Sequence, residues 1–323
     1  MEKVSKLGRP PKKQREWKGE HVPLKKDFKQ NWIVYLIFLP VFIYFFITCY
    51  LPMFGITMAF QDFDMVKGFF NSQWVGFDNF IELFTGDAFP TAFRNTMIMA
   101  LFSSTLGFVA PILFALLLSS VRNKKYRRVT QTVSYLPNFV AVMVVATLVQ
   151  QFLAEGGAIS AILSMFGLQD QNWLANPNPP VFWLINCLSG IWQGFGYGFI
   201  IYVAAISNIN GDYYEAAAID GANSWQRMWK ITLPSIMPMI LMMFILQMGV
   251  VTRVGFDKVL LLYMPQTFNV ADNLYTYTYR MAFGFPPDYG LGAASGLFQS
   301  VLGTVLLVIS NWLSKKSGKL KLF

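Results

Sequence analysis

Six long stretches without a charged residue constrain this chain more than any other feature. Each is rich in Phe, Leu, Ile, Val and Met, and each exceeds the roughly 20 residues that a helix needs to cross a membrane. They are residues 30–61, 95–121, 129–154, 171–211, 231–252 and 289–314. In lipid, backbone polar groups must be satisfied internally, so such stretches form helices or closed barrels. Because the runs lack the alternation of barrel strands, the sequence predicts an all-α, polytopic membrane protein with six transmembrane helices.

The composition places the chain outside the disordered and ordinary soluble classes. Hydrophobic residues make up 54% of it and charged residues only 13%. An average soluble domain has about 25% charged residues, and a disordered chain combines low hydrophobicity with high charge. These values exclude intrinsic disorder and disfavour a soluble enzyme.

The distribution of basic residues predicts the orientation in the membrane. Of 26 Lys and Arg residues, 21 lie in residues 1–29, in the connections after the second and fourth stretches, and beyond residue 314. The positive-inside rule places these segments in the cytoplasm, so we expect a multi-pass membrane protein with both termini inside. Residues 1–29 are then a basic tail, and residues 30–323 are the transmembrane domain. A tail that binds nucleic acid is the alternative, but a basic segment beside a first span is more typical of an orientation signal near anionic lipids.

Signatures of several enzyme and transporter classes are absent from the sequence. It contains no phosphate-binding loop, so we expect no ATP hydrolysis by that route and no catalytic site. No Cys or His cluster has the spacing of metal ligands, so we expect no metal. The six stretches hold no ionisable relay, which argues against a proton-coupled transporter. A sodium site made of backbone carbonyls stays open.

Glycine and proline patterns predict two local features. Gly190, Gly194 and Gly198 form two overlapping G-x-x-x-G units, which predict a close approach of membrane helices. Gly156-Gly157 and the Pro-rich run at residues 176–180 predict that the third connection is ordered by turns, with no helix through the Pro run.

The connection between the fourth and fifth stretches, residues 207–235, carries the most specific pattern. Asp212 is a predicted helix N-cap, and Glu215 three residues later completes a pair typical of a capping box. The alanines at 216–218 favour a helix with a smooth surface. Gly221 then permits a sharp turn.

The rest of this loop predicts a second helix and a return to the membrane. Asn223 or Ser224 can cap that helix, and Pro234 and Pro238 mark the return. The predicted product is a short, rigid element that faces the cytoplasm. An alanine-rich amphipathic linker without a partner is the alternative.

The same loop matches a family signature. Glu215-Ala216-Ala217, Asp220-Gly221-Ala222 and Ile231-x-Leu233-Pro234 have the spacing of the EAA motif, and the chain resembles the permeases of ABC importers. The resemblance implies the type I permease fold of these importers and a location in the cell membrane of a bacterium. It also implies that the loop is a coupling helix, which docks in a groove of a separate ATPase subunit. The residues implied for this docking are Glu215, Ala216, Ala217, Asp220, Gly221, Ala222, Leu233 and Pro234.

A second set of motifs resembles the carbohydrate branch of these permeases, most of all the sub-branch that imports oligosaccharides released from complex polysaccharides. These motifs are Tyr50–Gly55, Trp74–Phe80, Phe256-Asp257, Asp272, Thr276-Tyr277, Tyr279-Arg280, Tyr289-Gly290 and Gly296-Leu297-Phe298. The resemblance implies an alternating-access importer in which this chain pairs with a second, homologous permease. It further implies two cytoplasmic ATPase subunits that bind ATP and Mg, an extracytoplasmic sugar-binding protein, and no cofactor or nucleic acid on this chain.

Candidates for the substrate path are the aromatic and amide side chains of the third, fourth and fifth stretches. Sugars are bound by aromatic faces, amides and hydroxyls. The candidates are Trp192, Gln193, Phe195, Phe199, Tyr202, Asn138, Gln150, Gln151 and Gln247. Helix packing explains an aromatic stripe equally well, and hydrogen bonding between helices explains a buried Gln. The partner permease can also supply most of the sugar contacts.

Two other functions stay open from the sequence alone. One is a permease of the same mechanism for another solute, such as a peptide or glycerol phosphate. The other is a stand-alone secondary transporter, against which the coupling-type loop argues.

Overall fold

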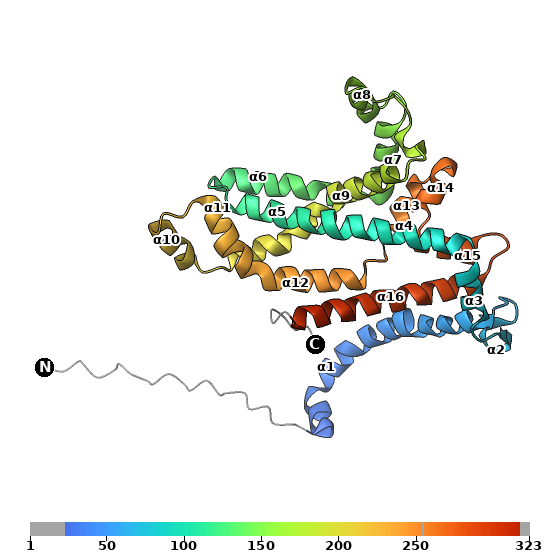
Figure 1. Cartoon of the computed structure of the whole chain (residues 1–323). Coiled ribbons are helices and arrows are strands. Elements are labelled where there is room, and N and C mark those ends of the chain that lie inside the picture. The colour runs from blue at the N-terminus through green and yellow to red at the C-terminus, as the bar shows by residue number, and fades with distance from the viewer. Residues whose placement is uncertain (1–22, 254, 317–323) are drawn as a thin grey trace. The chain divides into compact units, whose positions relative to one another are not determined.

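The computed structural model of this protein describes residues 23–253 and 255–316 (Figure 1). The chain divides into two compact units, residues 1–54 and 55–323. Within the described residues, six segments are long and apolar enough to cross a membrane, which confirms the predicted all-α, polytopic class. They are Lys26–Phe60, Ala88–Ser119, Val142–Met165, Pro179–Ser207, Ser224–Gly249 and Tyr289–Lys316. Most of the predicted basic tail, residues 1–22, lies outside the described residues.

Helix α1 (Leu24–Phe45) makes up most of the described part of the first unit. A π-helical turn, Phe46–Tyr50, follows it and leads into a 3-10 helix, Leu51–Phe60. The α1 backbone departs from helical geometry at Asn31, with φ −116° and ψ 22°. Asn31 Nδ2 donates a hydrogen bond of 2.7 Å to Asp27 Oδ1 across this bend, so a side chain supports the point where the helix is interrupted.

The first long connection of the second unit is tied to the last membrane helix. It contains β1 (Gln61–Asp62), α2 (Gly68–Asn71), β2 (Gln73–Trp74) and α3 (Asp78–Thr85), and the two strands pair antiparallel. Asn79 Nδ2 donates hydrogen bonds to the carbonyl oxygens of Ala59 (3.1 Å) and Gln61 (3.0 Å). Gly290 of α16 (Tyr289–Lys316) packs so closely that a Cβ there would lie 2.7 Å from Asn79 Nδ2. The Trp74–Phe80 motif thus has an architectural role in this connection.

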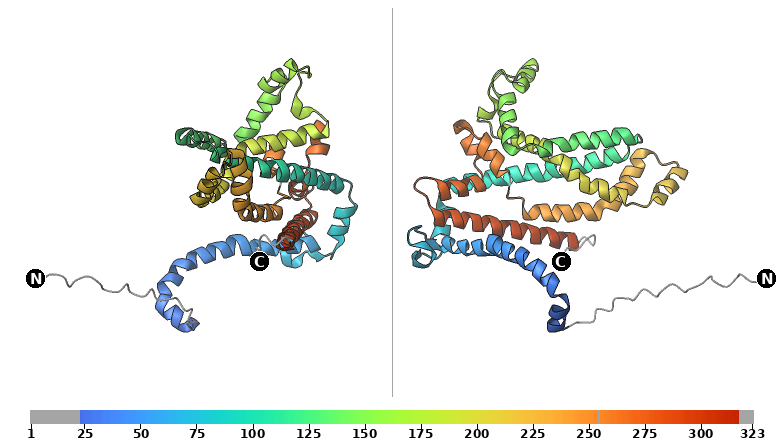
Figure 2. Two further views of the ribbon diagram at one scale, coloured as in Figure 1. Left: turned by 60° about the vertical axis from the view of Figure 1, so that its left-hand side comes forward. Right: turned by 180° about the vertical axis from the view of Figure 1, so that it is seen from behind.

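Long helices packed side by side form the core of the second unit. They are α4 (Ala88–Phe102) and α5 (Phe108–Ser119), which a π-helical turn (Ser103–Gly107) joins, then α9 (Pro179–Ser207), α12 (Leu233–Gly249) and α16. Helix α5 packs along α9, and α12 lies against α9 and α16 (Figures 1 and 2). The buried residues between α5, α9 and α12 include Ile112, Leu116, Phe199, Tyr202, Ile236 and Ile240. Membrane helices associate through such packing because lipid is as apolar as their side chains.

The third predicted helix, residues 129–154, is not continuous, so this prediction is wrong. Helix α6 (Lys124–Tyr135) ends in a 3-10 turn, Leu136–Phe139, and α7 (Val142–Leu153) begins after two extended residues. The turn contains Pro137, which cannot donate to the helical hydrogen-bond ladder. Gln193 Nε2 of α9 donates a hydrogen bond of 3.1 Å to the Val140 carbonyl oxygen. A side chain from another helix therefore satisfies a backbone group at the break, as an apolar surrounding requires.

Helix α9 approaches α6 most closely at Gly196. A Cβ at this position would overlap the backbone carbonyl of Ser134. Of the G-x-x-x-G residues, Gly198 packs against Pro111, where a Cβ would come within 3.2 Å of the ring, and Gly194 faces open space. The predicted close approach is confirmed at Gly198, but the tightest contact involves a glycine outside the motif.

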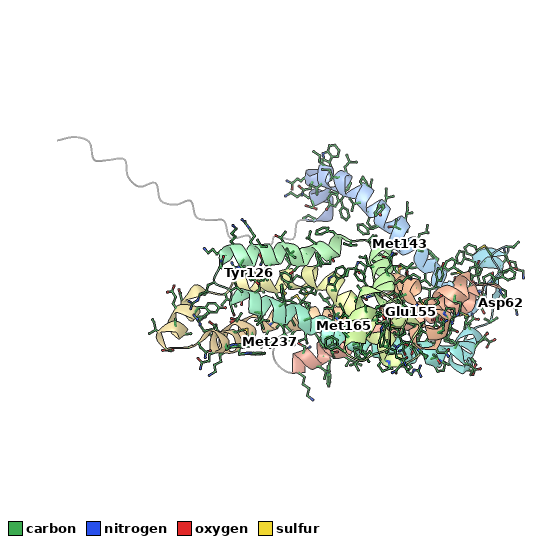
Figure 3. The ribbon with its side chains drawn as sticks, turned by 90° about the horizontal axis from the view of Figure 1, so that it is seen from above. Asp62, Tyr126, Met143, Glu155, Met165 and Met237 are labelled. Carbon is green, nitrogen blue, oxygen red and sulfur yellow. The ribbon has the colours of Figure 1, made fainter. Side chains whose placement is uncertain are left out.

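The connection after α7 contains the predicted turns and one helix that the sequence did not predict. Gly156 has φ +71°, and the new helix, α8 (Ala158–Met165), follows directly. Ser160 Oγ and the Gly156 N–H donate hydrogen bonds of 2.5 and 3.0 Å to Asp170 Oδ1. The hydrogen bond from Ser160, and to a smaller extent that from Gly156, holds the pKa of the Asp170 carboxyl below its ordinary value. In Figure 3, the labels Met143, Glu155 and Met165 mark the α7–α8 segment.

No helix passes through the Pro-rich run, which confirms the prediction, but the end of the run starts a helix. A 3-10 turn, Trp173–Ala175, precedes the run, and α9 begins within it at Pro179. Proline is tolerated in the first turn of a helix because the N–H that it lacks would have no partner there.

A buried ion pair organises the last connection. This connection contains α13 (Phe256–Leu262), a 3-10 turn (Pro265–Thr267), α14 (Phe268–Ala271) and α15 (Leu274–Phe283). Two guanidinium nitrogens of Arg280 contact the two carboxylate oxygens of Asp272, each at 2.9 Å, and Thr276 Oγ1 donates a third bond of 2.7 Å. Asp272 is buried. The three residues fix α14 and α15 together in the bidentate geometry that arginine favours.

Candidate functional site

Helix α10 (Gly211–Ile219) carries three of the predicted coupling residues, Glu215, Ala216 and Ala217, and Asp220, Gly221 and Ala222 follow it directly. Its N-cap is Asn210, so the prediction of Asp212 as the cap is wrong. Asn210 Oδ1 accepts a hydrogen bond of 3.0 Å from the Asp212 N–H, and Asn210 Nδ2 donates one of 2.9 Å to Asp212 Oδ2. The helix starts two residues earlier than predicted because a second capping residue stands before Gly211. Glu215 therefore does not occupy the capping-box position, and its side chain is exposed.

The C-terminus of α10 is closed by backbone hydrogen bonds around Gly221. The Gly221 N–H donates to the Ala218 carbonyl (3.2 Å), and the Ala222 N–H donates to the Ala217 carbonyl (2.8 Å). Gly221 has φ +74°, which confirms the predicted sharp turn. This pair of bonds with a left-handed glycine is the Schellman motif. It ends the helix without help from the rest of the protein.

A second capped helix leads from this turn into the membrane. In α11 (Ser224–Arg227), Asn223 and Gln226 form a reciprocal capping box with bonds of 2.8 Å in both directions. The prediction that Asn223 or Ser224 caps this helix is confirmed for Asn223. A π-helical turn, Met228–Thr232, then joins α11 to α12.

One side-chain contact ties α10 to the start of α12. The hydroxyl groups of Tyr214 and Thr232 lie 2.9 Å apart. No residue of α10 is buried, and Ile219 is 88% exposed. Leu233 packs against the apolar cluster between α5, α9 and α12, and Pro234 is exposed in the first turn of α12. Six of the predicted coupling residues, 215–217 and 220–222, therefore lie on a stiff protrusion, whereas Leu233 and Pro234 lie at the start of α12. The exposed Ile219 gives this protrusion an apolar side chain, which is typical of a protein-docking element.

A cavity of about 440 Å³ lies between the π-helical turn of the second span, α9, the end of α12 and α13. Two of the predicted substrate-path residues, Phe195 and Gln247, line it. Gly190 and Gly194 leave part of its α9 wall without side chains. The cavity combines an aromatic ring, an amide and exposed helix backbone, which are groups that can hold a sugar.

Lys258 of α13 also lines this cavity, and the sequence analysis missed it. It is only 7% exposed, and its Nζ donates hydrogen bonds to the Asn186 carbonyl (2.6 Å) and Ser189 Oγ (3.1 Å). Burial lowers the pKa of Lys258 to about 8. A lysine at the start of the apolar run Lys258–Leu262 was the signal that could have revealed it.

The other predicted substrate-path residues do not line this cavity. Phe199 and Tyr202 are buried in the cluster between α5, α9 and α12. Gln150 Nε2 donates a hydrogen bond of 2.8 Å to the Leu261 carbonyl, as Gln193 does to Val140. The remaining three residues have exposed side chains: Trp192, Asn138 and Gln151. The structure therefore brings together only two of the nine, and it shows the alternative roles of helix packing and interhelical hydrogen bonding for four.

Within residues 23–253 and 255–316, no three His, Cys, Asp or Glu side chains gather in a way that could hold a metal ion.

Six apolar spans, an exposed loop closed by local hydrogen bonds and a cavity between membrane helices are the features of a multi-pass membrane permease. The chain belongs to the family of binding-protein-dependent transport system inner membrane components, whose family model matches residues 107–319. This match includes the α10–α12 loop and most of the cavity.

Known proteins are similar to this chain over nearly its whole length. Protein LplB of Bacillus subtilis (strain 168) is 36% identical over 307 residues, which cover 93% of this chain and 92% of that protein. The polygalacturonan/rhamnogalacturonan transport system permease protein YteP of the same organism is 36% identical over 293 residues, 90% of each chain. A chain of the bacterial alginate ABC transporter, solved in complex with an alginate pentasaccharide-bound periplasmic protein, superposes with a TM-score of 0.84 at 37% identity. That similarity covers 93% of this chain and 99% of the solved one.

Proposed function

We propose that this chain is a transmembrane subunit of an ATP-driven, binding-protein-dependent importer of oligosaccharides, with fragments of a complex polysaccharide as substrates. The similarity to polysaccharide-transporting permeases over at least 90% of the chain carries this proposal. That similarity favours sugars over the alternatives of a peptide, glycerol phosphate or a stand-alone secondary transporter.

The proposed complex contains four further proteins. A second, homologous permease completes the membrane pathway, and two cytoplasmic ATPase subunits bind ATP and Mg. An extracytoplasmic binding protein delivers the sugar, as the periplasmic protein accompanies the alginate transporter. This chain itself performs no catalysis and holds no cofactor. Its termini lie in the cytoplasm, on the same side as α10.

Helix α10 transmits ATP binding to the membrane pathway. Its small residues Ala216 and Ala217 leave room for close contact with an ATPase groove, with Glu215, Asp220, Gly221 and Ala222 beside them. ATP binding and hydrolysis would bias the helices between two arrangements, one open to each side of the membrane.

Purification from the native membrane in mild detergent tests the composition of the complex. We expect a phosphate-loop ATPase and a second six-span permease to co-purify with this chain, and the purified complex to hydrolyse ATP. A chain that is isolated alone and transports sugar without ATP would contradict the proposal.

A substitution on α10 tests the coupling role. Ala216→Trp places a large side chain on the exposed docking surface without touching a buried residue. We expect ATP-dependent sugar uptake in proteoliposomes to fall at least about tenfold, because loss of a central interface contact costs more than ~1.4 kcal/mol. Ala216→Ser is the matched control and should retain uptake. Unchanged uptake by the Trp variant would refute docking at this position.

A further inference from the structure

A buried ammonium group in the cavity lacks an anionic partner. Within residues 23–253 and 255–316, the ion pairs are Lys67–Asp64 and Arg280–Asp272, and neither involves Lys258. Two of its three N–H groups donate to Asn186 and Ser189. Charged groups in the interior of a membrane protein are rare and usually pair or mark a substrate path. One donor of Lys258 is therefore available to a group in the cavity.

An unsatisfied acceptor lines the same cavity. Asn186 is only 4% exposed, and within the described residues its Oδ1 has no hydrogen-bond partner. Its Nδ2 lies 3.8 Å from Met99 Sδ, a weak acceptor. Buried polar atoms are nearly always hydrogen-bonded in folded proteins. The Asn186 oxygen is thus suited to a hydroxyl donor that enters the cavity.

Glycines keep the space around these groups open. A Cβ on Gly190 would come within 2.9 Å of Lys258 Nζ, so glycine is the residue that leaves the ammonium room. At Gly194 a Cβ would meet nothing within 4 Å. A ring-sized group can therefore approach the α9 backbone beside Phe195, whose ring offers an apolar face.

The charges that line the cavity are all positive. Arg253, in the exposed segment after α12, is the second cation, and none of the described lining residues is acidic. A carboxylate would complement both cations, and charge-assisted hydrogen bonds of this kind are stronger than neutral ones. A neutral sugar could satisfy Asn186 but would leave both cations without a counter-charge.

We propose that this cavity is a subsite for a sugar unit that carries a carboxylate, a uronic acid residue of the oligosaccharide, and that Lys258 is the specificity-determining residue. The carboxylate binds Lys258 Nζ and Arg253, and a ring hydroxyl donates to Asn186 Oδ1. This inference rests on the proposed function, since it names the substrate class of the same permease.

The test compares two trisaccharides that differ only in the oxidation of C6, trigalacturonate and α-1,4-galactotriose. The complete complex of both permeases and both ATPase subunits is placed in nanodiscs without the binding protein, and calorimetry measures the Kd of each probe. We expect trigalacturonate to bind at least about tenfold more tightly. Lys258→Gln should weaken trigalacturonate by about 10- to 100-fold, the range for loss of a hydrogen bond to a charged group, and leave galactotriose within about twofold.

Matched variants separate specificity from a structural role of Lys258. Lys258→Arg keeps the charge and should retain the preference for trigalacturonate. Arg253→Gln alters an exposed residue, so it tests the charge preference even if Lys258→Gln fails to fold. We expect this variant to weaken trigalacturonate severalfold and galactotriose not at all. Equal Kd values for the two probes, an equal loss of both in Lys258→Gln, or binding of neither probe at 10 mM would overturn the inference.

A second measurement distinguishes failure of the uronate subsite from failure of the proposed function. ATP-dependent uptake of trigalacturonate that is unchanged in Lys258→Gln would leave the importer function intact and refute the uronate subsite. Absence of both ATP hydrolysis and oligosaccharide uptake from the assembled complex would instead refute the importer.

Discussion

The α10–α12 loop and the cavity are assembled over very different distances along the chain. The hydrogen bonds that cap α10 and α11 join residues two to five positions apart, from Asn210–Asp212 to Ala217–Ala222. In the cavity, Lys258 bonds to residues of α9 that lie 72 and 69 positions away. The loop can therefore take its shape from its own sequence, whereas the cavity exists only when three membrane spans and α13 have packed. Substitutions in the loop should change local order and coupling, and substitutions around the cavity should change assembly or substrate preference.

The largest effect is expected at the close contact of α9 with α6, which, like the cavity, joins segments far apart in the sequence. Gly196→Val should prevent α9 from packing on α6, because the carbonyl of Ser134 occupies the space of any Cβ. Overpacking a tight contact costs roughly 1–3 kcal/mol or more, so we expect little monodisperse protein in detergent size-exclusion chromatography. Gly194→Ala, two residues away in open space, is the control and should elute as the native chain does. A normal profile for Gly196→Val would show that α9 and α6 can separate freely.

A pH titration tests whether carboxylate binding in the cavity depends on the charge of Lys258. Because the pKa of Lys258 is about 8, its ammonium is about nine-tenths protonated at pH 7 and about one-tenth at pH 9. Carboxylate binding that needs the ammonium is present below pH 8 and lost as the pH rises, so the affinity for trigalacturonate should fall about tenfold from pH 7 to 9. Calorimetry at both pH values measures this change.

Two variants isolate Lys258 as the titrating group. The other ionisable side chains that line the cavity are Cys187 of α9 and Arg253. Lys258→Arg should abolish the pH dependence, and Cys187→Ser should preserve it. A pH dependence that disappears in Cys187→Ser would assign the titration to the thiol instead.

The turn that ends α10 tests the loop side. Gly221→Val forces a β-branched residue to φ +74°, which costs roughly 1–2 kcal/mol. We expect faster amide hydrogen exchange in α10 and weaker sugar-stimulated ATP hydrolysis, with no change in the thermal stability of the membrane helices. Gly211→Ala is the control, because a Cβ there meets nothing within 4 Å. A loss of global thermal stability would show that the loop is not an independent unit.

The smallest effect is expected for the cap of α11. Asn223→Ala removes one half of the capping box and should destabilise this short helix by about 1 kcal/mol. The amide hydrogen exchange rate of residues 224–227 should rise about fivefold, because a loss of about 1 kcal/mol raises the equilibrium constant for local opening about fivefold. Ser224→Ala leaves the box intact and should show no change. Equal exchange in both variants would mean that tertiary contacts hold α11 in place.

The sequence predicted the features that depend on neighbouring residues. Charge-free stretches revealed the membrane class, and Gly221 and Asn223 were placed correctly because a turn and a cap need only local geometry. The N-cap of α10 was misplaced by two residues because Asn210 and Asp212 are both good caps, and position alone did not distinguish them. The third helix was predicted as continuous because an absence of charge does not reveal a break such as that at Pro137.

The cavity could not be predicted for a physical reason. A pattern of residues shows that Gln193 and Gln150 need partners in an apolar surrounding, but the partners turned out to be carbonyl groups on distant segments rather than a ligand. Lys258 lies outside the charge-free stretches, so the absence of ionisable groups within those stretches does not reveal it. Its burial depends on how α13 folds back onto α9, which no short stretch of the sequence encodes.

The bond between Tyr214 and Thr232 connects the two regions mechanically. Thr232 is the residue before α12, and this helix of 17 residues is a rod about 25 Å long. Gln247, near its far end, lines the cavity. In the proposed importer, a displacement of α10 by an ATPase subunit is therefore transmitted through Thr232 to α12, whose far end lines the proposed sugar subsite.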